Sequence, residues 1–158
     1  MAIFVPGAIC RICGARMTRN DEIVAFPPFV PNKRDPLYFF SDGVFHRRCF
    51  DNHPLSKQAA AFGSLAEERG LPQNRICIVC GETISNPDDY FSTGYITSDR
   101  KSPAFAFNYF QFHRRHFEEW GQASEFRRAI DSLTNSMGWD GPRVAFTPLP
   151  AWCWGASR

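Results

Sequence analysis

The sequence predicts a small α+β protein that contains the same unit twice in tandem. Three observations support this prediction. Two Cys-x2-Cys pairs occur, and a glycine follows each pair. A second pair of Cys or His side chains follows each of them after 32 intervening residues. Each of these residues in the first half has a counterpart 67 positions later, and the eight are Cys10, Cys13, His46, Cys49, Cys77, Cys80, His113 and His116.

The same offset relates much more than these side chains. Residues 10–50 and 77–117 share 11 identical residues in 41 aligned positions. The segment FHRRCF at 45–50 matches FHRRHF at 112–117. We therefore interpret the chain as an internal duplication. We expect a first unit at 1–70, a second unit at 71–141, and a Pro- and Trp-rich tail at 142–158.

The residue types indicate two structural zinc sites. Cys-x2-Cys places two thiolates on one tight turn, and the glycine that follows permits left-handed backbone. The spacing of three in His46/Cys49 and in His113/His116 places both side chains on one face of a helical turn. A disulfide across two residues would be strained, and six reduced core cysteines are the metal-free alternative. Four protein ligands per ion leave no open position, which favours structural over catalytic zinc.

Two ways of combining the four ligand pairs are open. Sequential pairing gives a Cys3His site in the first unit and a Cys2His2 site in the second. In a cross-braced arrangement, the first and third pairs would share one ion. The duplication favours sequential pairing, because a unit that once existed singly had to complete its own site.

Each unit is expected to contain a knuckle, a β-hairpin and a helix, in that order. The chain has 16 Phe, so any core should be aromatic rather than aliphatic. Turn residues and hydrophobic patterning predict the following elements for the first unit. They are an arm at 2–9, a knuckle at 10–14, strands at 15–18, 22–26 and 37–40, a loop at 27–31, and a helix from His46 to Arg69, interrupted at Pro54 and capped by Gly70.

The second unit repeats this pattern. We expect a turn at 86–89, strands at 91–97 and 105–112, and a helix that begins near His113. This helix breaks near Gly121, resumes to Met137, and has Gly138 as its cap. Its second part carries an apolar stripe formed by Phe126, Ile130, Leu133 and Met137.

The order of knuckle, hairpin and ligand-bearing helix resembles the treble-clef zinc finger over residues 10–70 and 77–138. The tandem Cys-x2-Cys…His-x2-Cys units also resemble LIM domains. LIM units have about half as many residues between their ligand pairs, and here a long helix follows each second pair. The resemblance therefore implies the treble-clef fold and structural zinc, but not a LIM function.

Net charge and motifs limit the function. A formal net charge of +2 argues against a nucleic acid held mainly by its phosphates. The pairs Arg47/Arg48 and Arg114/Arg115, between the ligands, are either anion-binding points or a solvated helix face.

The remaining candidate residues are expected to have structural roles. His53 is expected to be a cap or surface residue and Cys153 an inert thiol. Asp21-Glu22 and Asp88-Asp89 are expected to be turn acids. Neither predicted hairpin contains the histidine that treble-clef nucleases use.

We expect a non-enzymatic, zinc-stabilised module that binds another protein, as an adaptor or as an immunity-type inhibitor. Aromatic residues at 26–29 and 105–112 and in the tail, where Trp152 and Trp154 lie, either form the interface or close the units onto each other. The alternative is a nucleic-acid-binding regulator that uses the Arg pairs. The chain has no long apolar run and no charged segment at its start, so we expect a cytoplasmic protein without a membrane partner.

Overall fold

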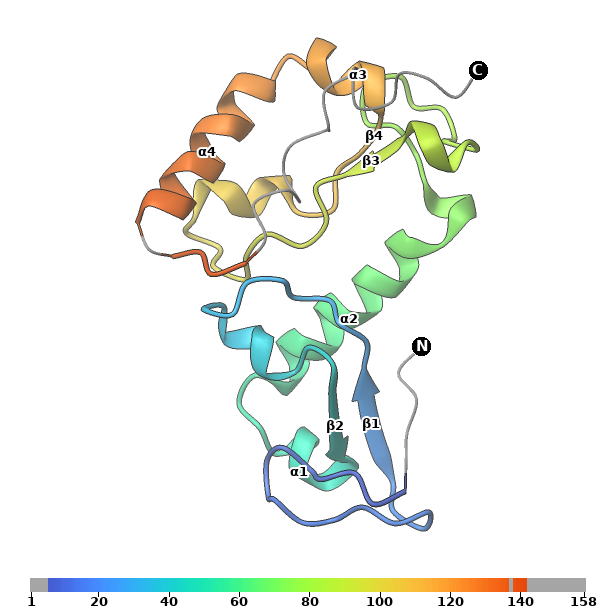
Figure 1. Cartoon of the computed structure of the whole chain (residues 1–158), viewed down its shortest axis with the longest axis vertical. Coiled ribbons are helices and arrows are strands. Elements are labelled where there is room, and N and C mark those ends of the chain that lie inside the picture. The colour runs from blue at the N-terminus through green and yellow to red at the C-terminus, as the bar shows by residue number, and fades with distance from the viewer. Residues whose placement is uncertain (1–5, 137, 142–158) are drawn as a thin grey trace.

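The computed structural model describes residues 6–136 and 138–141. It contains two antiparallel hairpins, each followed by two helices (Figure 1), which confirms the α+β prediction. The first unit consists of β1 (Ile23–Phe26), β2 (Gly43–His46), α1 (Arg47–Asp51) and α2 (Ser56–Gly70). The second consists of β3 (Tyr90–Ser92), β4 (Gln111–His113), α3 (Arg114–Glu119) and α4 (Ala123–Asn135). The expected arm at 2–9 lies partly, and the expected tail at 142–158 entirely, outside the described residues.

The duplication is visible in the register of the hairpins. Ile23 pairs with His46, and its counterpart Tyr90 pairs with His113. An isolated bridge joins Ile9 to Arg16, and an equivalent bridge joins Ile76 to Thr83. All these pairs are related by the 67-residue offset. The two copies therefore share one backbone arrangement around their knuckles.

Several predicted elements differ from those observed. The expected strand at 37–40 lies largely in a 3-10 helix (Pro36–Phe39). Of the expected strand at 105–112, residues 105–107 lie in another 3-10 helix (Pro103–Phe107), and residues 111–112 lie in β4 as predicted. In both 3-10 helices, a proline occupies the first turn and the preceding side chain caps it. Asp35 accepts from the backbone N–H of Leu37, and Ser102 accepts from that of Ala104. Local capping thus overrides the strand propensity of the aromatic residues.

Other predicted element boundaries also differ from those observed. The strand that completes the first hairpin is β2, which lies after the expected strand at 37–40 and ends at His46, where the helix is expected to begin. The expected strand at 15–18 contributes only a single bridge, and the one at 91–97 ends at Ser92. Helix α2 includes Gly70 and has Leu71 as its cap. Two shorter 3-10 helices span Pro72–Asn74 and Pro87–Asp89.

The core is aromatic in both units, as composition predicted. Phe26, Phe40, Phe45 and Phe50 pack against one another in the first unit, mostly tilted or edge-to-face. The second core gathers rings from β3, β4, α3 and α4 in the same way. Edge-to-face packing of this kind contributes beyond the area that it buries. The core therefore compensates for the shortness of the strands.

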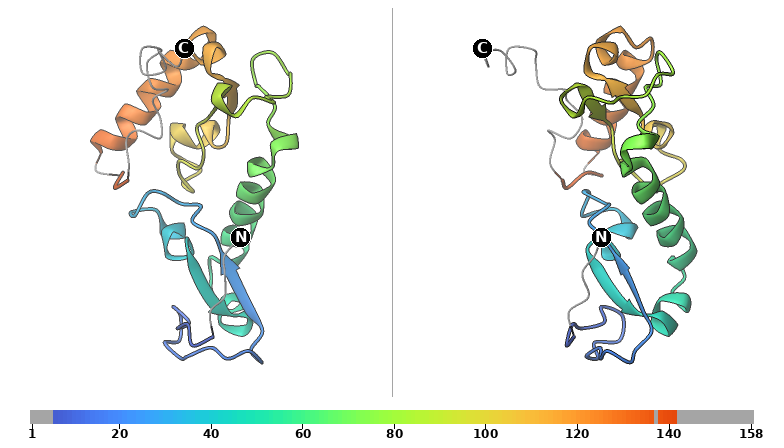
Figure 2. Two further views of the ribbon diagram at one scale, coloured as in Figure 1. Left: turned by 45° about the vertical axis from the view of Figure 1, so that its right-hand side comes forward. Right: turned by 90° about the vertical axis from the view of Figure 1, so that its right-hand side faces the viewer.

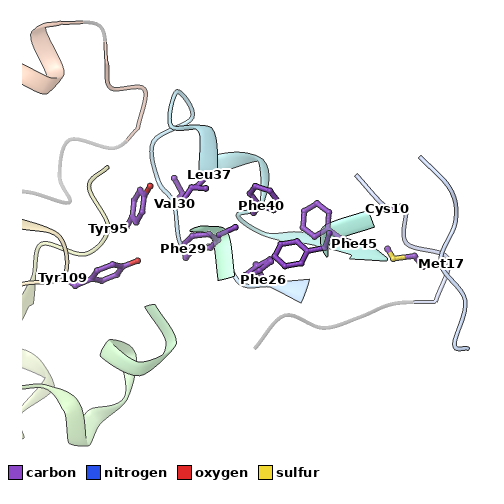
Figure 3. Close-up of a cluster of buried hydrophobic side chains, with 12 residues drawn as sticks. Cys10, Met17, Phe26, Phe29, Val30, Leu37, Phe40, Phe45, Tyr95 and Tyr109 are labelled. Carbon is purple, nitrogen blue, oxygen red and sulfur yellow. The ribbon is translucent and has the colours of Figure 1, made fainter. Parts of the chain in front are cut away.

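The two units pack on each other along the long axis, and α2 runs from the first towards the second (Figures 1 and 2). Tyr95 and Tyr109 belong to the second unit but lie in the core cluster of the first (Figure 3). The Tyr95 ring contacts Phe29 and Phe62, with centroids 6.1 and 5.3 Å away. Phe26 and Phe29 are thus both buried, and Phe29 closes the units onto each other through Tyr95.

Polar contacts fix this packing. The buried Asp35 carboxylate accepts from the backbone N–H and the hydroxyl of Ser98, at 2.7 and 2.9 Å. Asn32, also buried, donates to the carbonyl of Gly138 and accepts from the N–H of Asp140. Because these groups are directional and withdrawn from water, they hold one orientation of the units.

Candidate metal centres

The structure brings all eight predicted ligands together in two tetrads. One consists of Cys10, Cys13, His46 and Cys49, and the other of Cys77, Cys80, His113 and His116. Within each tetrad, one candidate ligand atom per residue lies within 4.8 Å of all the others. Each tetrad is drawn from one copy only. The pairs therefore combine sequentially, and the cross-braced alternative is wrong.

A knuckle turn positions the first two cysteines of each tetrad. Gly14 and Gly81 have φ values of +73° and +76°, in the left-handed region that glycine adopts without strain. Their N–H groups donate to the carbonyls of Cys10 and Cys77, both at 2.8 Å. The turn brings both thiols of each pair to the same side of the chain.

Backbone N–H groups also stabilise the first sulfur of each knuckle. Burial raises the pKa of the Cys10 thiol, but N–H groups of Cys13, His46 and Ile12 outweigh it and lower the pKa to about 6. In the second unit, burial is likewise outweighed by the N–H groups of the matching residues and by the His116 side chain. They lower the pKa of Cys77 to about 6. Both sulfurs therefore favour the thiolate form that a metal ion binds.

The third cysteine of the first tetrad has the opposite tendency. Burial, together with the nearby sulfurs of Cys13 and Cys10, raises the pKa of Cys49 to about 11. Crowded thiolates repel one another, and a divalent cation between them offsets that repulsion.

The distances between ligand atoms fit a tetrahedral ion. Sγ of Cys13 lies 3.4 Å from Nδ1 of His46, and Sγ of Cys80 lies 3.5 Å from Nδ1 of His113. The corresponding distance from Cys77 to His116 is 3.4 Å. Bonds of about 2.3 Å to sulfur and about 2.0 Å to nitrogen at tetrahedral angles place these atoms about 3.5 Å apart. The residues present therefore fit zinc.

Strand and helix together position the second pair of each tetrad. His46 and His113 end β2 and β4 and precede the helices, whereas Cys49 and His116 lie in the first turns of α1 and α3. The helix starts one residue later than predicted in both units. Helices α1 and α3 lie at opposite ends of the molecule (Figure 1), so the tetrads do too.

The arginine pairs are separated in the same way and do not form one surface. Arg47 lies 4.0 Å from Asp51 in an exposed ion pair, and Arg114 Nε donates to the carbonyl of Asp88 at 2.7 Å. His53 has the structural role that we expected. Its ring stacks on Phe39, and its Nδ1 accepts from the N–H of Leu55 at 3.2 Å. Cys153 lies outside the described residues.

Two features were not predicted from the sequence. The carboxylates of Asp21 and Asp89, taken for simple turn acids, lie 3.9 and 4.0 Å from Nε2 of His46 and His113. Four apolar side chains are exposed on and beside the second knuckle, and we call them the knuckle patch: Leu71, Ile76, Ile78 and Val79. The pattern IleCysIleValCys was the only available signal for the patch, since it places apolar residues around the ligands.

Comparison with family models, with curated proteins and with solved structures found no match. Among the described residues, no helix is both long and apolar enough to cross a membrane. The site geometry therefore carries the functional argument.

Proposed function

We propose that this chain is a non-enzymatic module that binds another protein and is stabilised by two structural zinc ions, one in each tetrad. Four protein ligands complete a tetrahedral ion, whereas catalytic zinc keeps a position for water or substrate. The order of knuckle, hairpin and helix in both units supports the likeness to treble-clef zinc fingers. The ions would hold each knuckle against its helix, which suits units with such short strands.

The knuckle patch is the observation that carries this proposal. Its four side chains are between 41% and 46% exposed, although each is apolar. Ile78 and Val79 belong to the knuckle, whose conformation a bound ion would fix, and Ile76 directly precedes its first cysteine. Exposed apolar side chains gathered in this way are typical of protein-binding surfaces. Phe26 and Phe29 do not contribute, because both are buried, Phe26 among rings of the first unit and Phe29 against Tyr95 of the second.

The two knuckles differ chiefly at one position of the patch, since the first also exposes an isoleucine, Ile9, which matches Ile76. Arg11 occupies the position that matches Ile78, and its guanidinium donates to the carbonyls of Ser41 and Asp42 at 3.0 and 2.6 Å. It thereby ties the first knuckle to the loop before β2. Ile78 makes no such bond, and 46% of it remains exposed. A binding role for this end of the molecule accounts for that difference.

The test is a pull-down from a lysate of the native host, with the tagged full chain as bait. It is carried out at moderate salt, with and without nuclease. We expect one stoichiometric protein that survives both treatments and is lost at least tenfold with Ile78→Arg. Arginine already occupies the matching position of the first knuckle, so this variant is expected to fold. Ile9→Arg changes an exposed isoleucine at the other end and is the matched control, which should retain the partner. Equal capture by Ile78→Arg, or no stoichiometric protein, would contradict the proposal.

One observation favours nucleic-acid binding as a second candidate. Five arginines are exposed around the first tetrad, and three of them have uncharged counterparts in the second unit. They are Arg11, Arg16, Arg19, Arg47 and Arg48. If this end binds nucleic acid, the same pull-down yields nucleic acid that is released steeply by salt, and charge reversal at Arg48 reduces it.

A further inference from the structure

Each candidate zinc ligand at the end of a hairpin faces a carboxylate on its other side. Nδ1 of His46 lies 3.4 Å from a cysteine sulfur, and its Nε2 lies 3.9 Å from Oδ2 of Asp21. Nδ1 of His113 lies 3.5 Å from a sulfur, and its Nε2 lies 4.0 Å from Oδ2 of Asp89. Both rings therefore present one nitrogen to the tetrad and the other to an acid.

Each carboxylate is itself held in place by hydrogen bonding, Asp21 by two bonds and Asp89 by one. Oδ2 of Asp21 accepts from the N–H and the hydroxyl of Thr18, at 2.6 and 2.9 Å. Oδ1 of Asp89 accepts from the N–H of Arg114 at 3.0 Å. Neither acid depends on the histidine for its orientation. Each is placed before a metal ion binds.

The two acids do not occupy equivalent positions of the duplication. The counterpart of Asp21 is Asp88, whereas the counterpart of Asp89 is Glu22. In the first unit, the carbonyl of Glu22 accepts from the N–H of Arg47 at 2.7 Å. In the second, the Asp89 side chain takes the equivalent N–H of Arg114. The acid beside the histidine is therefore one residue later in the second unit than the alignment of the two copies would place it. The distance from its carboxylate to the histidine is nevertheless nearly the same in both units.

We infer that Asp21 and Asp89 are positioning residues that raise the zinc affinity of their own tetrads. At 3.9 and 4.0 Å they lie beyond hydrogen-bond length, so they act through their negative charge, which favours the form of each histidine with its proton on Nε2. This inference rests on the proposed binding of zinc. With the proton on Nε2, Nδ1 keeps a free electron pair directed at the tetrad. A carboxylate beside the N–H also stabilises the positive charge that the ring acquires when it binds a cation, and removal of such partners typically weakens metal binding about 10- to 100-fold.

The experiment uses the full chain, zinc as the probe and a competing chelator. The side-chain ¹H–¹⁵N resonances of His46 and His113 report the occupancy of each site separately. We expect Asp21→Asn to weaken zinc binding at the first site about 10-fold or more and to leave the second within about twofold. Asp89→Asn should do the reverse. Asparagine can still accept from Thr18 or Arg114, so the local backbone is expected to persist.

Asp88→Asn is the matched control, since the duplication aligns Asp88 with Asp21 but the structure does not place it on His113. It should leave both affinities unchanged, and Asp21→Glu should restore part of the loss. At saturating zinc, the Nε2–H resonance of His46 should move in Asp21→Asn, which a purely structural role would not produce. Unchanged affinity in the Asp21 and Asp89 variants, or an equal effect of Asp88→Asn, would overturn the inference. A wild-type chain that binds no zinc would overturn the proposed function as well.

Discussion

Replacement of Asp35 by serine tests what joins the two units. Asp35 is 6% exposed and makes two kinds of contact. Within its own unit, it caps the first 3-10 helix through the N–H of Leu37 at 2.9 Å. Across to the second unit, it accepts both bonds from Ser98. Serine is the residue at the matching position, 102, where it makes only the local cap. Asp35→Ser should therefore keep the cap and remove the bridge.

The magnitude follows from the groups left without a partner. The N–H and hydroxyl of Ser98 lose a charged acceptor at a site that is 8% exposed. A hydrogen bond to a charged group contributes about 1.5–3 kcal/mol, and a buried donor left unpaired costs about 1–3 kcal/mol. Relief from burying the carboxylate offsets part of this loss. We expect the free energy of unfolding to fall by about 2–4 kcal/mol.

The assay is urea unfolding of the zinc-saturated chain, followed by circular dichroism. Ser102→Ala is the matched control, because it removes only a local cap and should cost about 1 kcal/mol. If Asp35→Ser costs less than about 0.5 kcal/mol, or no more than the control, the buried bridge does not hold the units together. The reasoning from burial and hydrogen bonding would then be refuted.

Three further predictions follow from the structure. Cys13→Ser should reduce bound zinc from two ions to one and unfold the first unit, because structural zinc contributes on the order of 10 kcal/mol to folding. A variant that binds one ion fewer but still unfolds cooperatively with unchanged stability would contradict this prediction. Burial, with the Asp35 carboxylate nearby, raises the pKa of Tyr95, and burial raises that of Tyr109. Their contribution to stability is therefore fully present below about pH 10, where the unfolded tyrosine ionises, and is lost as the pH rises above it. Urea midpoints measured from pH 8 to pH 11 should fall at the upper end, and less so in Tyr95→Phe. Gly14→Ala should destabilise the protein by about 1 kcal/mol, because Gly14 has a positive φ. Gly70→Ala should stabilise it by about 0.5–1 kcal/mol, because Gly70 lies in a helix with open space around it. Thermal unfolding should therefore show changes in melting temperature of opposite sign for the two variants.

The sequence by itself determined the duplication, the aromatic core, the order of knuckle, hairpin and helix, and the eight candidate ligands. These features are readable because coordination chemistry and turn geometry act over a few residues, so Cys-x2-Cys-Gly and His-x2-Cys/His carry their meaning locally. Because every ligand position recurs 67 residues later, the assignment of ligands in one half supports the same assignment in the other. Zinc binding and protein binding themselves stay predictions.

Only the tertiary structure decided what depends on the path of the chain between distant residues. It combined the ligand pairs within each copy, placed one expected strand and the first part of another in capped 3-10 helices, and put Tyr95 in the core of the other unit. It also gave Asp89, and not the aligned Asp88, the position beside His113. The two halves of the sequence have the same spacing, so the sequence alone does not reveal these differences between the units. Each difference depends on contacts between residues far apart in the chain, which local spacing does not determine.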